Sequence, residues 1–237
     1  MKLDDICLVN TNVAVSDDFY RELLGFERRM RNVRFADFVF TTGPRLAMWM
    51  RPSIAETVGA GYPAAAGLPF RLTIQVPAQM VADVAGRVPG ARRDAAGGVS
   101  VVDPDGFALE LVAGETAHSR VSRVEIVVGD PDRTAAFLER LGFARTGSTF
   151  DAGGTELVLV AVDALPLDGF GHAGGHLMLA VELDSGDEVD RLHAELVGRG
   201  LVASGPPADF EWGARSSYFV DPDGYIWEIY AWVAEPR

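Results

Sequence analysis

Two glutamates and one histidine are the side chains whose type and spacing point most directly to chemistry. Glu110 follows the turn Asp103-Pro104-Asp105-Gly106 by four residues, and Glu228 follows an identical turn at 221–224 in the same way. His176 begins a strand-like apolar run. Carboxylates and an imidazole together can hold a metal such as Mn, Fe or Zn. These side chains could therefore form a divalent cation site or, without a metal, orient a polar ligand.

Covalent catalysis has no comparable signal. No serine, cysteine or lysine lies in a recognisable nucleophile motif. The single cysteine, Cys7, lies beside Ile6 and Leu8 in a predicted strand, where we expect a small buried side chain. A single cysteine also excludes an intrachain disulfide.

The two glutamates belong to a repeat that spans the chain. Asp103 and Asp221 open the two identical turns, 118 residues apart. The blocks Leu24-Gly25-Phe26 and Leu141-Gly142-Phe143 recur at an offset of 117. Both ends of the unit therefore repeat at nearly one spacing, which indicates an internal duplication.

Each half is predicted to contain two units of strand, helix and further strands. In the first half, strands are predicted at 5–10, 34–41, 45–51, 70–76 and 107–112, with helices at 16–24, capped by Ser16, and 77–88. In the second half, strands are predicted at 123–128, 176–183, 216–220 and 225–231, with helices at 131–141 and 186–198. No glycine-rich phosphate loop follows a first strand, which disfavours a dinucleotide-binding fold. The regular strand–helix alternation of an α/β barrel is absent as well.

Composition limits the partners. The 237 residues carry a formal net charge of -13, and 48 % of them are hydrophobic. An acidic chain has no electrostatic attraction to nucleic acid or anionic lipid, so we predict neither as a partner. Attraction of a cationic ligand would need a local acidic site. The sequence has no apolar signal region and no membrane-length apolar stretch, so we predict a cytoplasmic protein.

The ordered motifs resemble the glyoxalase / bleomycin-resistance / extradiol-dioxygenase group of the vicinal oxygen chelate superfamily. The resemblance rests on the first strand, the Asp-Phe-Tyr and Leu-Leu-Gly-Phe blocks and the closing Asp-Pro-Asp-Gly-x-x-x-Glu, and it extends from about Leu3 to Tyr230. It implies an α+β fold of four βαβββ modules that form two curved mixed β-sheet cups, with the helices outside. We predict two tandem glyoxalase-like domains, residues 1–115 and 119–237.

The resemblance also implies positions for metal ligands. Family enzymes typically hold a divalent metal with side chains from the first strand of a module, often His, and from the last strand, often Glu. The closing glutamates are Glu110 and Glu228, and the matching first-strand positions are Asp5, Arg71, Arg123 and His176. The two arginines depart from the family pattern, because a guanidinium stays protonated and is not a useful metal ligand.

Two pairings of the modules are open. If neighbours in the sequence pair, Asp5, Arg71 and Glu110 share one cup, and Arg123, His176 and Glu228 share the other. If the first module pairs with the fourth, as in some relatives, Asp5, His176 and Glu228 come together. That set could hold one divalent metal such as Mn, Fe, Ni or Zn.

Aromatic and thioether side chains could line the cups. The candidates are Met48, Trp49, Met50, Phe210, Trp212, Tyr218, Trp227 and Trp232. Such walls favour a flat or apolar ligand. A tyrosine near the place of Tyr218 assists proton transfer in extradiol dioxygenases, but no histidine lies between 194 and 237, so we do not expect ring cleavage.

These observations support two hypotheses. The first is a metal-free, cofactor-free protein that binds a drug-like or aromatic molecule, with Trp49, Arg71, Glu110, Arg123, Trp212 and Tyr218 as its ligand-binding residues. The second is a metal-dependent lyase, isomerase or dioxygenase-like enzyme. Its candidate catalytic residues are His176, Glu228 and Tyr218, and its metal ligands His176, Glu228 and Asp5. We favour the first, and expect a monomer or a homodimer.

Overall fold

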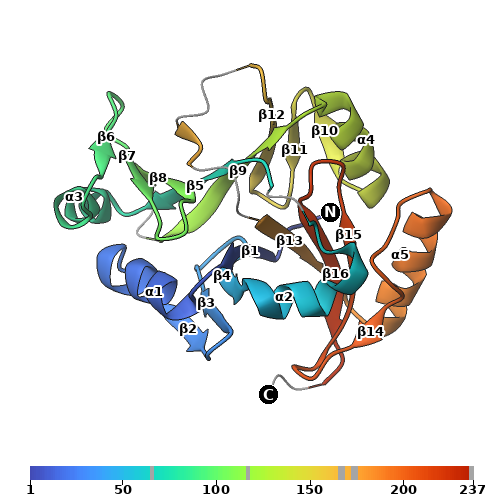
Figure 1. Ribbon diagram of the computed structural model, residues 1–237. Coiled ribbons are helices and arrows are strands. Elements are labelled where there is room, and N and C mark those ends of the chain that lie inside the picture. Colours follow the sequence, from blue (N-terminus) through green and yellow to red (C-terminus); the bar gives the residue numbers. More distant parts are fainter. Residues whose placement is uncertain (65–66, 116–117, 165–168, 172–175, 235–237) are drawn as a thin grey trace.

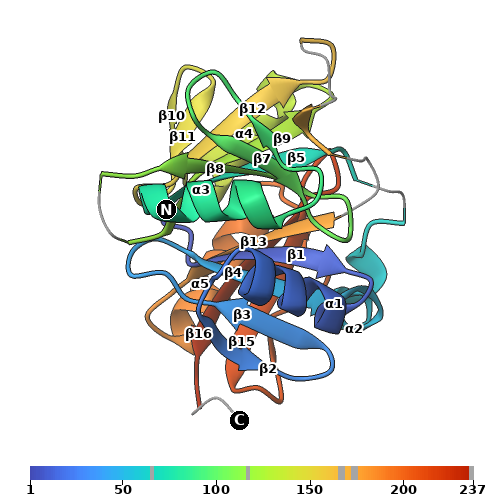
Figure 2. The same ribbon diagram turned by 90° about the vertical axis from the view of Figure 1, so that its left-hand side faces the viewer.

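The chain forms two eight-stranded sheets, A and B, that lie against each other with helices around them (Figures 1 and 2). The computed structural model describes residues 1–64, 67–115, 118–164, 169–171 and 176–234. Four modules, each with a first strand, a helix and further strands, build the two sheets. The predicted α+β fold of tandem modules is therefore confirmed.

Sheet A contains modules 1 and 4. Module 1 consists of β1 (Asp5–Asn10), α1 (Val13–Asp18), the π-helical turn η1 (Phe19–Leu23), β2 (Arg28–Arg31), β3 (Phe35–Phe38) and β4 (Arg45–Met50). Helix α2 (Arg51–Val58) and the 3-10 turn η2 (Gly59–Gly61) follow it. Module 4 consists of β13 (His176–Glu182), α5 (Gly186–Gly198), β14 (Ala208–Asp209), β15 (Ala214–Val220) and β16 (Ile226–Trp232).

Sheet B contains modules 2 and 3. Module 2 consists of β5 (Phe70–Val76), α3 (Ala78–Arg87), β6 (Arg92–Arg93), β7 (Val99–Val102) and β8 (Ala108–Ala113). Module 3 consists of β9 (Arg120–Val128), α4 (Pro131–Leu141), β10 (Ala144–Thr146), β11 (Thr149–Asp151) and β12 (Glu156–Ala161).

The first strands of partner modules lie side by side in the middle of each sheet. In sheet A, β1 runs antiparallel to β13, with Ile6 opposite Leu179. In sheet B, β5 runs antiparallel to β9, with Leu72 opposite Val124. Module 1 therefore pairs with module 4, and module 2 with module 3, which decides between the two open pairings. Each sheet takes one module from each half of the chain, and the domain boundaries 1–115 and 119–237 stay a prediction from the repeat.

Local sequence explains where two of the helices begin. The side chain of Asp130 accepts hydrogen bonds from the first backbone N–H groups of α4, and Gly142 ends this helix in a left-handed conformation with φ of 105°. The side chain of Asn12 caps α1 in the same way. The predicted cap, Ser16, lies inside α1 instead, where it is buried and bonded to the side chain of Asn10.

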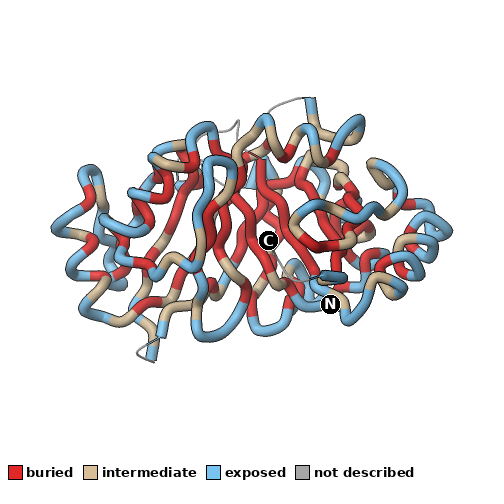
Figure 3. The backbone as a smooth tube through the Cα atoms, turned by 90° about the horizontal axis from the view of Figure 1, so that it is seen from below, coloured by how far each residue is buried: buried red, intermediate tan, exposed pale blue. Residues whose placement is uncertain are grey.

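One hydrophobic core joins the faces of both sheets that pack against helices. Ile6 of β1, Leu72 of β5 and Trp227 of β16 all belong to it. Buried backbone is concentrated in the strands through the middle of the molecule, while helices and turns at the periphery are exposed (Figure 3). The opposite faces of the sheets are therefore left to form the cups.

The two Asp-Pro-Asp-Gly turns connect the sheets. Asp105, in the turn before β8 of sheet B, accepts hydrogen bonds from the side chain of Asn10 at 2.7 Å and the backbone N–H of Thr11 at 2.9 Å, both in sheet A's module 1. Asp223, in the turn before β16 of sheet A, accepts from the backbone of Gly129 at 2.9 Å and the hydroxyl of Thr134 at 2.7 Å, both in module 3. The repeated motif thus reverses the chain and also forms hydrogen bonds between the two sheets.

Among the helices of the described residues, none combines the length and the apolar character that crossing a membrane requires.

Candidate functional site

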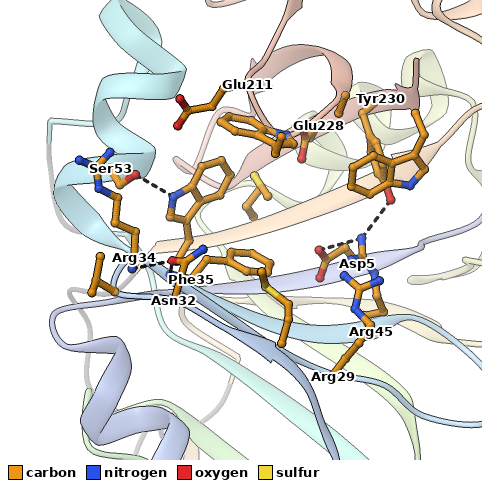
Figure 4. Close-up of a pocket in the computed structure, with 17 residues that line it drawn as sticks. Asp5, Arg29, Asn32, Arg34, Phe35, Arg45, Ser53, Glu211, Glu228 and Tyr230 are labelled. Atoms are coloured by element: carbon orange, nitrogen blue, oxygen red, sulfur yellow. Dashed lines mark hydrogen bonds and ion pairs between the residues drawn. The ribbon is translucent and has the colours of Figure 1, made fainter. Parts of the chain in front are cut away.

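The cup of sheet A, the face that carries Asp5, Trp49, Met178 and Glu228, encloses a cavity of about 690 Å³ (Figure 4). Strands β1, β4, β13 and β16 supply its floor. The β2–β3 hairpin, the segment between β14 and β15 and the first turn of α2 supply its walls. Module 1 and module 4 therefore both contribute to the site.

Aromatic rings form much of the wall. Trp49 makes edge-to-face contacts with Phe35, at 6.0 Å between ring centroids, and with Trp212, at 5.4 Å. Tyr230 and Trp232 form a second edge-to-face pair at 5.6 Å. Aromatic pairs of this geometry hold their rings in place and present large flat surfaces. The predicted ligand-binding residues Trp49 and Trp212 thus lie at the cavity.

The other predicted lining residues have different places. Phe210 stacks behind Trp212 at 4.6 Å rather than facing the cavity. Met48 and Trp227 are buried in the main core, because strand alternation turns them to the opposite face. Met50 lies at the end of β4 and packs against the same core.

Arg45 organises the charged end of the floor. Its guanidinium lies 3.1 Å from Asp4, 3.2 Å from Asp5 and 3.3 Å from Asp37. It also donates a hydrogen bond to the hydroxyl of Tyr230 at 3.0 Å. Three carboxyl groups therefore share this one cation at close range.

Asp5 is the most unusual carboxyl group of the site. Its side chain is only 7 % exposed. Burial raises its pKa from 3.8 to about 7, although the Arg45 guanidinium opposes the shift. Its Oδ2 atom contacts Arg45, whereas its Oδ1 atom is buried and has no hydrogen-bond partner among the described residues. A buried acceptor without a partner is costly, and a ligand with a donor would relieve that cost.

Glu228 is the second buried carboxyl group of the floor. The hydroxyl of Tyr218 donates a hydrogen bond to it at 2.8 Å. Burial raises the pKa of Glu228, and the Tyr218 bond acts in the opposite direction. Tyr218 itself is buried in the apolar cluster that also contains Trp49 and Met178, and it does not line the cavity. It therefore positions Glu228 rather than contacting a ligand.

His176 lies outside the cavity, at the start of β13. Its ring packs edge-to-face against Tyr62, at 5.1 Å between centroids. Burial lowers its pKa, and the nearby Arg51 adds to the effect. The imidazole is therefore held as a neutral group away from Asp5 and Glu228.

The strand register explains why His176 is displaced. In sheet B, Arg71 pairs with Ala108, two residues before Glu110. In sheet A, the residue that pairs with Ile226, two residues before Glu228, is Met178. Met178 therefore occupies the first-strand position that the sequence comparison assigned to His176. A displacement of two residues keeps the same face of the strand but moves the side chain along it.

The side chains at the family's ligand positions do not fit a metal ion. Asp5 and Glu228 are present, but Met178 supplies a thioether, which is a poor ligand for Mn, Fe or Zn. Arg45 lies 3.2 Å from Asp5 and would repel a divalent cation. Across the described residues, no three His, Cys, Asp or Glu side chains are grouped as a metal would require.

The cup of sheet B contains the remaining predicted residues, joined in ion pairs. Arg71 forms a two-bond pair with Glu125, at 2.6 and 2.9 Å, and lies 3.9 Å from Glu110. Arg123 is exposed and pairs with Glu156 at 2.6 Å. Arg71, Glu110 and Arg123 therefore lie away from the cavity of sheet A. Each arginine is neutralised by a neighbouring glutamate.

Several site residues were not predicted, although alternation along the strands could have indicated them. Arg45 precedes Trp49 by four residues, and Tyr230 follows Glu228 by two, so both share the face of their predicted neighbour. Glu125 stands in the same relation to Arg123. Phe35 comes from a strand that has no motif, and only the fold brings it to the cavity.

Comparisons with known proteins agree with this architecture. The sequence model of the Glyoxalase/Bleomycin resistance protein/Dioxygenase superfamily matches residues 120–229. No curated protein matches the chain.

Solved structures resemble the chain along nearly its whole length. A dioxygenase-like protein of Bacillus subtilis subsp. subtilis str. 168 has 18% identity and a TM-score of 0.65, covering 99% of this chain and 86% of its own. Glyoxalase I of Zea mays has 16% identity and a TM-score of 0.64, covering 97% of this chain and 92% of its own. At these identities the likeness concerns the fold.

Proposed function

We propose that the cup of sheet A is the functional site of this chain, whose residues 120–229 match the model of the Glyoxalase/Bleomycin resistance protein/Dioxygenase superfamily, and that it binds a flat aromatic molecule without a metal. The aromatic wall is the observation that carries the proposal. Trp49, Phe35 and Trp212 are locked edge-to-face beside a cavity of about 690 Å³. That volume is in the range of small-molecule sites, roughly 300–1,000 Å³.

The chemistry of the floor supports binding without a metal. Met178 stands where a metal site would need a stronger ligand, and Arg45 already neutralises part of the acidic floor. The floor instead offers hydrogen-bonding groups to the polar end of a ligand, while the walls cover its flat body.

Tryptophan fluorescence tests the proposal directly, because three of the four tryptophans, Trp49, Trp212 and Trp232, line the cavity. We expect 1-methylnaphthalene to quench the emission with a saturable dependence on concentration. We expect EDTA to leave the affinity unchanged. Absence of saturable quenching, or loss of binding in EDTA, would contradict the proposal.

A matched pair of variants locates the binding site. Trp49→Ala should weaken binding by about tenfold, since removing a well-packed aromatic contact costs roughly 1–2 kcal/mol. Phe170→Ala removes an aromatic ring that lies 4.7 Å from the Arg71 guanidinium in the cup of sheet B. It should leave the affinity unchanged, and equal losses in both variants would place the ligand elsewhere.

A further inference from the structure

Carboxyl groups outnumber guanidinium groups around the floor of the sheet A cavity. Asp5, Glu228, Arg29 and Arg45 line it, and Asp4 and Asp37 pair with Arg45 without lining the cavity. Asp4, Asp5 and Asp37 surround Arg45, and Asp37 also contacts Arg29. Adding Glu228 to this cluster gives four carboxyl groups against two guanidinium groups. These four carboxyl groups and two guanidinium groups are called the acidic floor below.

The mouth of the cavity does not compensate for this excess. Arg34 and Glu211 both lie there, are exposed and have opposite charges (Figure 4). Water screens exposed charges, whereas buried charges act on a ligand at close range. The acidic floor therefore acts on an enclosed ligand more strongly than Arg34 and Glu211 do.

Two carboxyl groups of the acidic floor belong to residues that line the cavity, Asp5 and Glu228. Asp5 Oδ1 is buried, faces no hydrogen-bond partner among the described residues and belongs to a residue that lines the cavity. Glu228 also lines the cavity and accepts a hydrogen bond from Tyr218. A positively charged nitrogen would satisfy such carboxyl groups through charge-assisted contacts, which are stronger than neutral ones.

The walls suit the same kind of ligand. Aromatic faces attract cations through their quadrupoles, and aromatic cages with nearby carboxylates are a common way of binding organic ammonium groups. Here five aromatic residues line the cavity above the acidic floor: Phe35, Trp49, Trp212, Tyr230 and Trp232.

We infer that the ligand of this cavity is an aromatic organic cation. Its flat body lies among Phe35, Trp49 and Trp212, and its positive nitrogen lies against Asp5 and Glu228. The inference rests on the proposed function of the same cavity and adds the charge of the ligand to it.

Three probes of similar size and different charge test the inference: 1-methylquinolinium, 1-methylnaphthalene and 1-naphthoate. We expect the cation to bind about tenfold more tightly than the neutral compound, which corresponds to about 1.4 kcal/mol, and the anion to bind most weakly. Equal binding of cation and neutral compound, or tighter binding of the anion, would overturn the charge preference and leave the proposed aromatic site intact. Failure of all three to bind would overturn both.

Matched variants assign the preference to the acidic floor. Asp5→Asn and Glu228→Gln should each reduce the affinity for 1-methylquinolinium about tenfold and change that for 1-methylnaphthalene by less than about threefold. Retained binding of the neutral probe shows that a variant is folded. Glu110→Gln, at the equivalent position of sheet B, should leave both affinities unchanged. If the protein still prefers the cation after Asp5→Asn and Glu228→Gln, the assignment to the acidic floor is wrong. The three probes measured on the wild type test the charge preference even if a variant fails to fold.

Discussion

Met178 and Glu228 lie on neighbouring strands of the cavity floor, and Asp5 lies on the strand on the other side of Met178. When residues of β13 are assigned by their pairing with β16 near Glu228, these three positions are the ones that the family resemblance assigns to metal ligands. Of the three side chains only Met178 lacks a nitrogen or oxygen ligand atom, and the guanidinium of Arg45 beside Asp5 also opposes a cation. A single substitution can therefore test whether the position or the side chain excludes a metal.

We predict that Met178→His creates metal affinity. The new imidazole would join Asp5 and Glu228 as a third ligand, the usual minimum for a protein site. Elemental analysis after loading with Zn and desalting should find close to one equivalent of metal in this variant and much less in the wild type.

His176→Ala provides the control for this prediction. Because His176 packs against Tyr62 outside the cavity, its removal should change the metal content of neither protein. Stoichiometric metal in the wild type that disappears in His176→Ala would show that the metal-ligand assignment from sequence was correct and the register argument wrong.

The buried carboxyl group of Asp221 should make the stability of the protein depend on pH. Burial raises its pKa from 3.8 to about 7, although Trp227 and two backbone N–H groups oppose the shift. The folded state therefore holds a proton that the unfolded state releases, so this contribution to stability is complete below about pH 4 and is lost as the pH rises through 7. The loss is on the order of a few kcal/mol.

Asp221→Asn removes this titration. Its deficit in unfolding free energy relative to the wild type should be larger at pH 5 than at pH 8, as measured by urea denaturation. Asp94→Asn, in an exposed turn, serves as the control and should give a deficit that is small at both values. A deficit for Asp221→Asn that grows with pH would reverse the sign of the argument.

At the scale of the elements, the repeat allowed the modules to be predicted, but not their partners. Periodicity, turns and caps are local, so the order of strands and helices follows from neighbouring residues. Pairing depends on contacts between residues far apart, such as Ile6 and Leu179, and both alternatives satisfied the same local pattern.

The candidate site shows the same division. Asp5, Trp49, Trp212 and Glu228 were predicted and line the cavity. His176 was predicted to lie with Asp5 and Glu228, but it lies outside the cavity. A shift of two residues in the register of β13 turns the same face inward, so the apolar pattern of the sequence is the same for both registers. The network of Arg45 with Asp4 and Asp37 joins three segments of module 1, and spacing in the sequence gives no measure of their distance.

At the scale of the whole molecule, the two sheets are joined by the repeated turns as well as by the shared core. Asp105 and Asp223 each reach from one sheet into the other, so each turn acts on the relative position of the sheets. The bonds from Asn10 to Asp105 and from Thr134 to Asp223 are partly buried, where a lost partner costs more than on the surface.

Replacing either aspartate should therefore loosen the whole molecule. We expect Asp105→Ala and Asp223→Ala each to lower the free energy of unfolding by about 1–3 kcal/mol in urea denaturation. Asp94→Ala is the matched control, because the side chain of Asp94 accepts a hydrogen bond from the backbone of Gly98 within its own turn. Losses no greater than that of Asp94→Ala would mean that the shared core alone holds the sheets together.

The exchange of modules also has a consequence for synthesis. Sheet B has all its strands once β12 has left the ribosome, because modules 2 and 3 are consecutive. The strands of module 1 emerge first, yet their edge at β1 stays open until β13, at residues 176–182, arrives to cover it. An uncovered strand edge invites pairing with other chains. The cavity of sheet A is therefore the last part of the protein to be completed, and the edge of β1 stays uncovered for most of the translation.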